Sequence, residues 1–153
     1  MARVALPRPE DTTDPAIDEI FAWVTEMEGS VPNHFFVELN FPEFFVAKLG
    51  ATKVLWQMGE LSMDEIQRVG ILVSQANGCA YCTAAFCTIL NFGLGTAEDE
   101  VAALLKEGLE TADDDRLKAV LTYALQVNSA PAAVTDLQID ALRDCGLKIG
   151  RAH

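Results

Sequence analysis

Helix-start signals recur along this chain and constrain its fold more than any other feature. Asp14 precedes Pro15, the order of an N-cap followed by a first helical turn, and Ser62 precedes Glu65 at the spacing of a capping box. Apolar side chains then repeat at helical intervals, and no window alternates apolar and polar residues as a half-buried strand does. The sequence therefore predicts an all-α fold of about seven helices.

The expected helices are separated by residues that break helical structure. They begin after Asp14, at Pro42, near Met63 and at Cys79, and the fourth is expected to run to about Asn91. Three more begin after Thr96, Thr111 and Thr135, each followed three residues later by a second start signal, Asp99, Asp114 and Gln138. A loop is expected over residues 30–34, and Asn77-Gly78 is expected to end the third helix. The third and fourth helices should therefore be joined by a short turn.

The length of 153 residues favours a single folded domain. Residues 1–13 contain prolines and show no periodicity, so we expect an extended N-terminal arm. Residues 14–147 are expected to form the helical core domain. Residues 148–153 have no helical pattern and are interpreted as a tail or an expression remnant.

The charge of the chain excludes two classes of partner. The 23 acidic and 11 basic side chains give a formal net charge of −12, which opposes nucleic-acid phosphates and anionic lipids. The sequence has neither a signal-peptide pattern at its start nor a run of about 18 uncharged apolar residues. We therefore expect a cytoplasmic protein that binds neither nucleic acid nor membrane.

A cysteine pair, Cys79-Ala-Tyr-Cys82, stands at the start of the fourth expected helix. Residues three apart share a helix face with Cα atoms roughly 5 Å apart, which is within the range that a disulfide accepts. The unpaired amides at a helix start also favour the reactive thiolate. Cys79 and Cys82 are therefore candidate catalytic residues of a redox-active dithiol.

Two other interpretations of the pair stay open at this point, a zinc site and two inert cysteines. Zinc would need two more ligands, and the other cysteines, Cys87 and Cys145, are isolated in the sequence. Cys87 also rises about 7.5 Å above Cys82 along one helix, too far to join the pair. We favour redox chemistry with no metal and no cofactor.

The stretches from Leu61 to Gln67 and from Val73 to Cys82 resemble the core of the alkylhydroperoxidase D-like and carboxymuconolactone decarboxylase superfamily. Val31-Pro-Asn33 and Phe41-Pro42 are similar to the segments that precede this core. The resemblance implies an all-α fold that assembles as a dimer, trimer or hexamer. It also implies an antioxidant peroxidase activity, in which the cysteine pair reduces a hydroperoxide and receives electrons from a thiol or a protein donor.

Two positions of the family pattern are altered in this chain. The pattern has a glutamate twelve residues before the first cysteine and a histidine four residues after the second, and these positions hold Gln67 and Phe86. The resemblance implies that this pair relays protons for the cysteines. Neither a glutamine amide nor a phenyl ring can act as a base near neutral pH. General-base activation, typically worth about 10²–10⁴-fold in rate, is therefore missing from its usual place.

No other side chain is a strong replacement for the missing base. Glu65 lies on roughly the opposite helix face from Gln67 and already serves the capping box. Tyr81 is a secondary candidate, although a phenol is a poor base near neutral pH. His34 is the other secondary candidate, in the predicted loop, where a histidine is usually a solvated side chain.

Three functions follow from these observations. The first is a thiol-disulfide oxidoreductase with alkylhydroperoxidase-like activity, weakened by Gln67 and Phe86. The second is a non-catalytic or small-ligand-binding paralogue with an apolar pocket beside Phe86. The third, lactone decarboxylation, fits a cysteine pair least, because that reaction depends on polar acid-base groups. The division of roles between Cys79 and Cys82 stays open.

Overall fold

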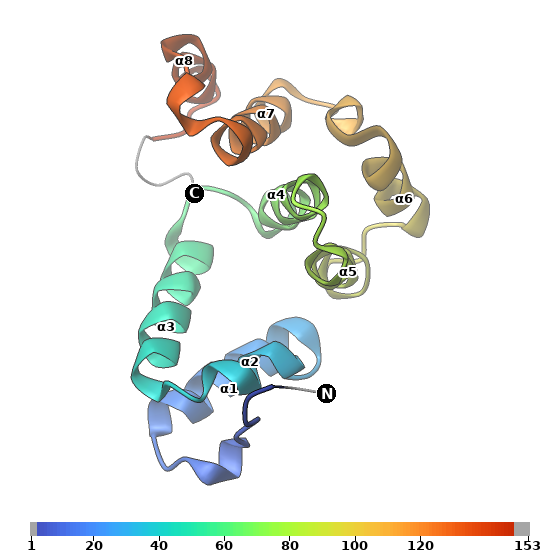
Figure 1. Cartoon of the computed structure of the whole chain (residues 1–153). Helices are drawn as coiled ribbons and strands as arrows, with labels where there is room; N and C mark the ends of the chain where they lie inside the picture. The colour runs from blue at the N-terminus through green and yellow to red at the C-terminus, as the bar shows by residue number, and fades with distance from the viewer. Residues whose placement is uncertain (1–2, 149–153) are drawn as a thin grey trace. The chain divides into compact units, whose positions relative to one another are not determined.

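The fold is entirely helical in the computed structural model, which describes residues 3–148 (Figure 1). Its α-helices are α1 (Pro15–Glu28), α2 (Asn33–Glu38), α3 (Pro42–Met58), α4 (Met63–Ala76), α5 (Ala80–Thr88), α6 (Glu98–Glu107), α7 (Asp115–Ser129) and α8 (Asp136–Asp144). Short 3-10 helices cover Pro9–Asp11, Gly108–Thr111 and Pro131–Ala133, and a π-helical segment covers Ile89–Gly93. Residues 3–148 contain no β-strand, so the predicted all-α fold is confirmed.

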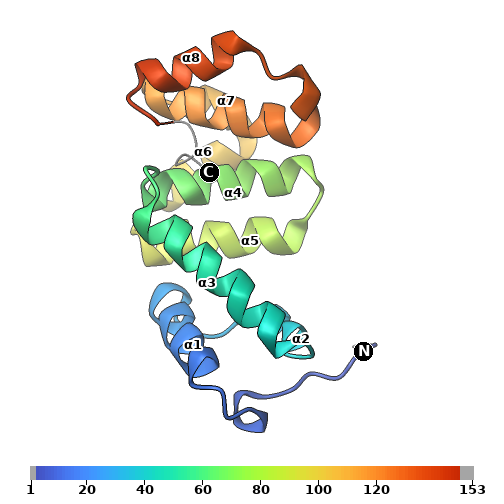
Figure 2. The same ribbon diagram turned by 90° about the vertical axis from the view of Figure 1, so that its left-hand side faces the viewer.

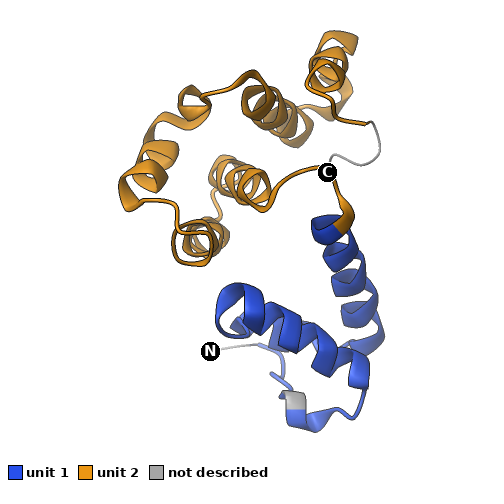
Figure 3. Ribbon diagram, turned by 180° about the vertical axis from the view of Figure 1, so that it is seen from behind, with its two compact units in different colours: residues 1–57 blue, residues 58–153 orange. Residues whose placement is uncertain are grey.

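The chain separates into two compact units, residues 1–57 and residues 58–153 (Figure 3). This division falls inside the predicted core domain of residues 14–147, whose boundaries stay a prediction. In the predicted arm, residues 3–8 form no helix or strand and are followed by the 3-10 helix Pro9–Asp11. Of the predicted tail, only Lys148 lies within the described residues.

The first unit is built on the predicted start of α1. Asp14 Oδ1 accepts a hydrogen bond from the Ala16 N–H at 2.9 Å, and Pro15 occupies the first turn. The helix ends at Gly29, whose positive φ of 75° suits glycine. The apolar core of this unit contains Ile17, Ile20, Phe21, Trp23, Val24, Phe35, Leu39, Phe45 and Leu49.

Helix α2 is additional to the helices that the sequence predicted. Asn33 and His34 were predicted to lie in a loop, and this prediction is wrong because both belong to α2. Phe35 and Leu39, four residues apart, are both buried in the core of the first unit. A six-residue helix is too short to show periodicity, so packing of these two side chains decides its structure.

In the second unit, α4 lies between α5 and α7, as Figures 1 and 2 both show. One core cluster contains Ile71, Leu72, Leu90, Val101, Leu104, Leu117 and Leu121. A smaller cluster contains Leu61, Val120, Leu142 and Leu147. The central helix α4 therefore positions the residues that follow it, including the cysteine pair.

Two predicted capping boxes are confirmed. The Glu65 N–H donates to Ser62 Oγ at 3.2 Å, and the Ser62 N–H donates to Glu65 Oε2 at 2.7 Å. The Thr135 N–H likewise donates to Gln138 Oε1 at 2.9 Å at the start of α8. These bonds satisfy backbone N–H groups that the first helical turn leaves unpaired.

Two other predicted helix starts are displaced. Ala97 rather than Thr96 precedes α6, and its side chain makes no capping bond. Thr111 closes a 3-10 helix, and Asp114 caps α7 by accepting a hydrogen bond from the Leu117 N–H at 2.7 Å. A carboxylate at this position satisfies the same backbone donor that a threonine hydroxyl would.

No helix within residues 3–148 is long and apolar enough to cross a membrane.

Candidate functional site

The turn between α4 and α5 places the first cysteine. The Asn77 N–H donates to the Val73 carbonyl at 3.0 Å, and Gly78 has a positive φ of 67°. The Cys79 N–H then donates to the Ser74 carbonyl at 2.9 Å. Glycine adopts this left-handed backbone conformation without steric cost, so Asn77-Gly78 ends α4 as predicted and turns the chain into α5.

Cys79 occupies the N-cap position of α5. Its Sγ accepts a hydrogen bond from the Cys82 N–H at 3.3 Å. The Cα atoms of Cys79 and Cys82 are 5.4 Å apart, and their sulfur atoms are joined as a disulfide. Both residues are partly exposed, whereas Cys87 and Cys145 are free thiols. The geometry therefore allows the pair to exist as a disulfide without rearrangement of the backbone.

The helix that carries Cys82 differs in length from the prediction. A single helix was expected from Cys79 to Asn91, but α5 ends at Thr88 and continues as the π-helical segment Ile89–Gly93. Such segments occur frequently at functional sites, and they displace the side chains that follow by a fraction of a turn. Cys82 and Phe86 both lie in the α-helical part, before the π-helical segment begins.

Phe86 packs directly on the backbone of α4. A Cβ atom built on Gly70 would lie 2.5 Å from Cδ1 of the Phe86 ring, so the ring occupies the space that any larger residue at position 70 would need. Phe86 also packs against the larger core cluster of the second unit. An isolated glycine inside a helical pattern is a sequence signal for such a close contact, and Gly70 was not singled out.

Gln67 lies one turn before Gly70 on the same face of α4. Its side chain is 0% exposed, and neither Oε1 nor Nε2 has a hydrogen-bond partner within the described residues. A buried amide in this position costs about 1–3 kcal/mol unless another group supplies hydrogen bonds. The altered relay positions therefore combine a packed ring with a buried neutral amide.

The two secondary candidates lie in different units. Tyr81 is the second residue of α5 and is 56% exposed. His34 is half-buried on α2 in the first unit, and burial is the main cause that lowers its pKa, although Glu38 acts in the opposite direction. The expectation that His34 is a solvated loop residue is therefore wrong, and a relay role for either residue stays a prediction.

A partly buried ion pair at the start of α4 was not foreseen. Arg116 Nε donates to Glu65 Oε1 at 2.6 Å, and Arg116 Nη2 donates to the Glu60 carbonyl at 2.8 Å. Burial alone would raise the pKa of Glu65, but its hydrogen bonds with Arg116 and Ser62 outweigh burial and lower it. Glu65 is thus held as a carboxylate by structural partners.

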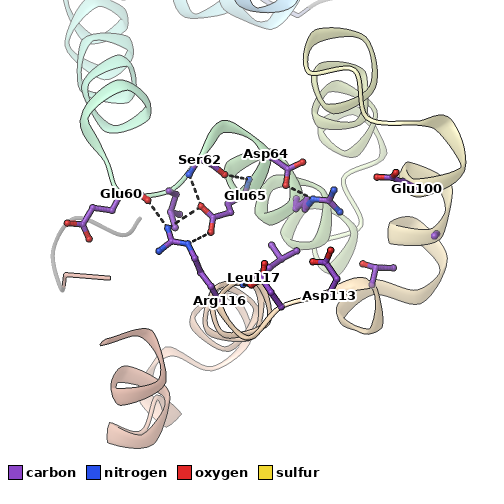
Figure 4. Close-up of a pocket in the computed structure, with 13 residues that line it drawn as sticks. Glu60, Ser62, Asp64, Glu65, Glu100, Asp113, Arg116 and Leu117 are labelled. Carbon is purple, nitrogen blue, oxygen red and sulfur yellow. Dashed lines mark hydrogen bonds and ion pairs between the residues drawn. The ribbon is translucent and has the colours of Figure 1, made fainter. Parts of the chain in front are cut away.

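The same residues border a cavity of about 830 Å³ (Figure 4). Its charged lining consists of Glu60, Asp64, Glu65, Arg68, Glu100, Asp113, Asp114 and Arg116. Arg68 is paired with Asp64 at 2.6 Å, so both arginines are engaged by carboxylates. On α4 the lining reaches Arg68, so about 12 Å of helix, at 1.5 Å per residue, lies between this cavity and Ala76 at the end of the helix, next to the cysteine turn.

A second cavity of about 350 Å³ has a mostly apolar lining of Leu61, Val69, Val73, Val120, Tyr123, Ala124, Val127, Asn128 and Leu142. It lies against the α4 face that carries Val69 and Val73, not beside Phe86, where an apolar pocket was expected. Within residues 3–148, no cluster of three or more histidine, cysteine or acidic side chains could hold a metal ion.

Comparison with known proteins places this geometry in a family. A family model described as the carboxymuconolactone decarboxylase family matches residues 42–126. No curated protein matches the sequence.

Two crystal structures of the debrominase Bmp8 have a similar fold. The apo structure has a TM-score of 0.77 and 21% identity, covering 94% of this chain and 76% of Bmp8. A cysteine-to-alanine variant in complex with 2,3,4-tribromopyrrole has a TM-score of 0.77 and 20% identity, covering 94% of this chain and 75% of Bmp8. At these identities the likeness concerns the fold alone. Because the family model matches more than half of the length of this chain, the chain belongs to the carboxymuconolactone decarboxylase family.

Proposed function

We propose that this protein is a thiol-disulfide oxidoreductase with alkylhydroperoxidase-like activity, in which Cys79 and Cys82 form the reacting pair. One observation carries the proposal: Cys79 caps α5, its sulfur accepts the Cys82 N–H, and the two sulfurs are within bonding distance of one another. A sulfur that accepts a backbone N–H at a helix start is favoured as a thiolate.

The proposed reaction balances as two successive thiol steps. One cysteine thiolate attacks the O–O bond of a hydroperoxide, becomes a sulfenic acid and releases an alcohol after protonation. The second thiol attacks the sulfenic sulfur, so that the Cys79–Cys82 disulfide forms and water leaves. A thiol or protein donor then supplies two electrons and two protons to restore the dithiol.

The altered relay positions set the expected rate. Gln67 and Phe86 supply no base, so the start of α5 must provide the thiolate and turnover should be slow. The proposal includes a cytoplasmic location, a hydroperoxide substrate and assembly as a dimer, trimer or hexamer. Each of these comes from the family resemblance or the composition and needs its own measurement.

Peroxide consumption by cysteine variants tests the proposal. The purified protein is mixed with cumene hydroperoxide and dithiothreitol, and the remaining peroxide is measured over time. We expect slow consumption by wild type, loss of it in Cys79→Ser and in Cys82→Ser, and no change in the control Cys145→Ser. Equal rates in wild type and both pair variants would show that the dithiol is not the peroxidase site.

A second candidate function is binding of a small apolar ligand without catalysis. The cavity between α4 and α7 favours it, because its size and largely apolar lining, with Tyr123 and Asn128 as polar groups, are typical of ligand sites. Native mass spectrometry of protein purified under mild conditions would detect an apolar passenger. Two results together would favour binding over redox chemistry. The Val73→Trp variant would lose the passenger, and the cysteine pair would be unreactive toward thiol reagents.

Lactone decarboxylation remains the third candidate because the family carries that name. Gln67 and Phe86 replace two titratable groups, which argues against an acid-base reaction at this place. An assay with a carboxymuconolactone should give no product, and turnover in this assay would overturn that expectation.

A further inference from the structure

Two side-chain amides join α4 to α7 directly beside the cysteine turn. Asn77 Nδ2 donates to Asn128 Oδ1 at 2.9 Å, and Asn128 Nδ2 donates to Asn77 Oδ1 at 3.1 Å. Each amide therefore acts as both donor and acceptor toward the other. This reciprocal pair links positions 51 residues apart in the sequence.

Asn77 connects this hydrogen-bonded pair to the cysteines, because it is close to them in the chain. It follows the last turn of α4, and only Gly78 separates it from Cys79. Gly78 has few steric restrictions on its backbone, so hydrogen bonds hold its conformation: its own N–H donates to the Gln75 carbonyl at 2.9 Å, and further bonds hold the residues on either side. The Cys79 side is held by its bond to Ser74, and the Asn77 side chain is held by Asn128.

We infer that Asn128 is a positioning residue for the Cys79–Cys82 pair and acts through Asn77. A disulfide requires both sulfurs at bonding distance, whereas a dithiol tolerates many arrangements of the turn. A link that fixes the turn therefore favours the disulfide over the dithiol. The inference rests on the proposed function only in requiring that the pair can cycle.

The redox equilibrium of the pair measures this effect without any peroxide. In dithiothreitol buffers, the Cys79–Cys82 disulfide takes two electrons and two protons from dithiothreitol, which becomes its cyclic disulfide. In Asn128→Ala, the equilibrium constant for reduction should rise about threefold to tenfold, the scale expected for losing hydrogen bonds between neutral groups. Asn128→Asp puts a carboxylate oxygen in place of the donor Nδ2, opposite the acceptor Asn77 Oδ1, so its shift should be at least as large.

Two controls separate positioning from general loss of structure. Gln126 lies on the same helix and donates to the Ala130 carbonyl at 3.0 Å, so Gln126→Ala removes an exposed amide without touching Asn77. Its redox equilibrium should match wild type. In an Asn77→Ala background, adding Asn128→Ala should cause no further shift, because the partner is already absent.

Three outcomes would overturn the inference. A shift in Asn128→Ala no larger than that in Gln126→Ala, or the same Asn128→Ala shift with and without Asn77, would remove the positioning role while leaving the proposed function intact. A wild-type pair that neither reduces nor reoxidises in any buffer would overturn the proposed function and this inference together.

Discussion

The Phe86 ring lies against the α4 backbone at Gly70, so closely that a Cβ at position 70 would be 2.5 Å from ring atom Cδ1. The two residues are therefore mutually dependent, because Gly70 provides the space that the Phe86 ring occupies. This contact explains how the family core accommodates a phenyl ring in place of an imidazole. It also makes Gly70 a sensitive test of the packing beside the cysteines.

Gly70→Ala should destabilise the protein by about 1–3 kcal/mol, because the new methyl group overlaps the Phe86 ring. Urea unfolding measures the change. Gly50→Ala is the matched control, since Gly50 also lies inside a helix and a Cβ there meets nothing within 4 Å. That substitution should be neutral or stabilising by up to about 1 kcal/mol.

The double variant Gly70→Ala with Phe86→Leu should recover part of the loss, because a smaller side chain gives the methyl group room. If Gly70→Ala is as harmless as Gly50→Ala, the close packing of Phe86 on α4 is wrong.

Restoring both relay groups should raise peroxidase activity. Gln67→Glu with Phe86→His supplies a carboxylate and an imidazole at the family positions, and general-base catalysis is typically worth about 10²–10⁴-fold. We expect the double variant to consume cumene hydroperoxide at least about tenfold faster than wild type, with each single variant gaining much less. The measurement is initial rate against pH, with dithiothreitol as donor.

The Cys82→Ser substitution in that background is the control, since it should abolish the gain. A folded double variant with the wild-type rate would show that the absent relay does not limit this protein.

Local signals in the sequence predicted most of the helices. Asp14, Ser62 and Thr135 cap helices where expected, because a cap depends on residues within one turn. The helix starts predicted at Thr96 and Thr111 lie one and three residues further along: Asp114 takes the cap before α7, whereas α6 follows Ala97, whose side chain makes no capping bond. The helix α2 was missed because burial of Phe35 and of Leu39, the residue that follows the helix, stabilises it rather than a local pattern.

The candidate site was predictable only where its residues are close in the sequence. Cys79 and Cys82 form one helical turn, so their spacing alone predicted the pair. Arg116 and Asn128 each contact partners 51 residues away, and no local pattern identifies such contacts. The burial of Gln67 follows from helical periodicity, but its lack of a partner within the described residues depends on everything that packs around it.

Glu28→Gln should stabilise the protein at neutral pH. Burial raises the pKa of Glu28, which means that the folded state holds its carboxylate at a cost. Its position in the last turn of α1, where the helix dipole disfavours negative charge, acts in the same direction. The free energy of unfolding should rise by up to about 1 kcal/mol at pH 7.

This gain should disappear as the pH falls below about 4, where Glu28 is protonated in both folded and unfolded chains. Glu26→Gln, an exposed neighbour in the same last turn, is the control and should gain only the part of the effect that comes from the helix dipole. A destabilised Glu28→Gln variant at pH 7 would indicate that the carboxylate has a stabilising partner instead.

Removal of the Glu65 carboxylate should destabilise the second unit and change how stability depends on pH. Arg116 Nε lies 2.6 Å from Glu65 Oε1, and the Arg116 side chain is 35% exposed, so Glu65→Gln should cost about 2–3 kcal/mol rather than the full loss of a completely buried pair. The pKa of Glu65 is lowered in the folded state because its hydrogen bonds with Arg116 and Ser62 outweigh the effect of burial. The contribution of the Glu65 carboxylate to the free energy of unfolding is therefore fully present above the unfolded pKa of about 4.3. It is lost as the pH falls through the lower folded pKa. Urea unfolding from pH 7 to pH 3 should show wild type and Glu65→Gln converging at the acid end, whereas Asp140→Gln, which removes an exposed partner of Arg143, should run parallel to wild type within about 0.5 kcal/mol. A constant difference between Glu65→Gln and wild type across this range would mean that the carboxylate charge is not what stabilises the start of α4.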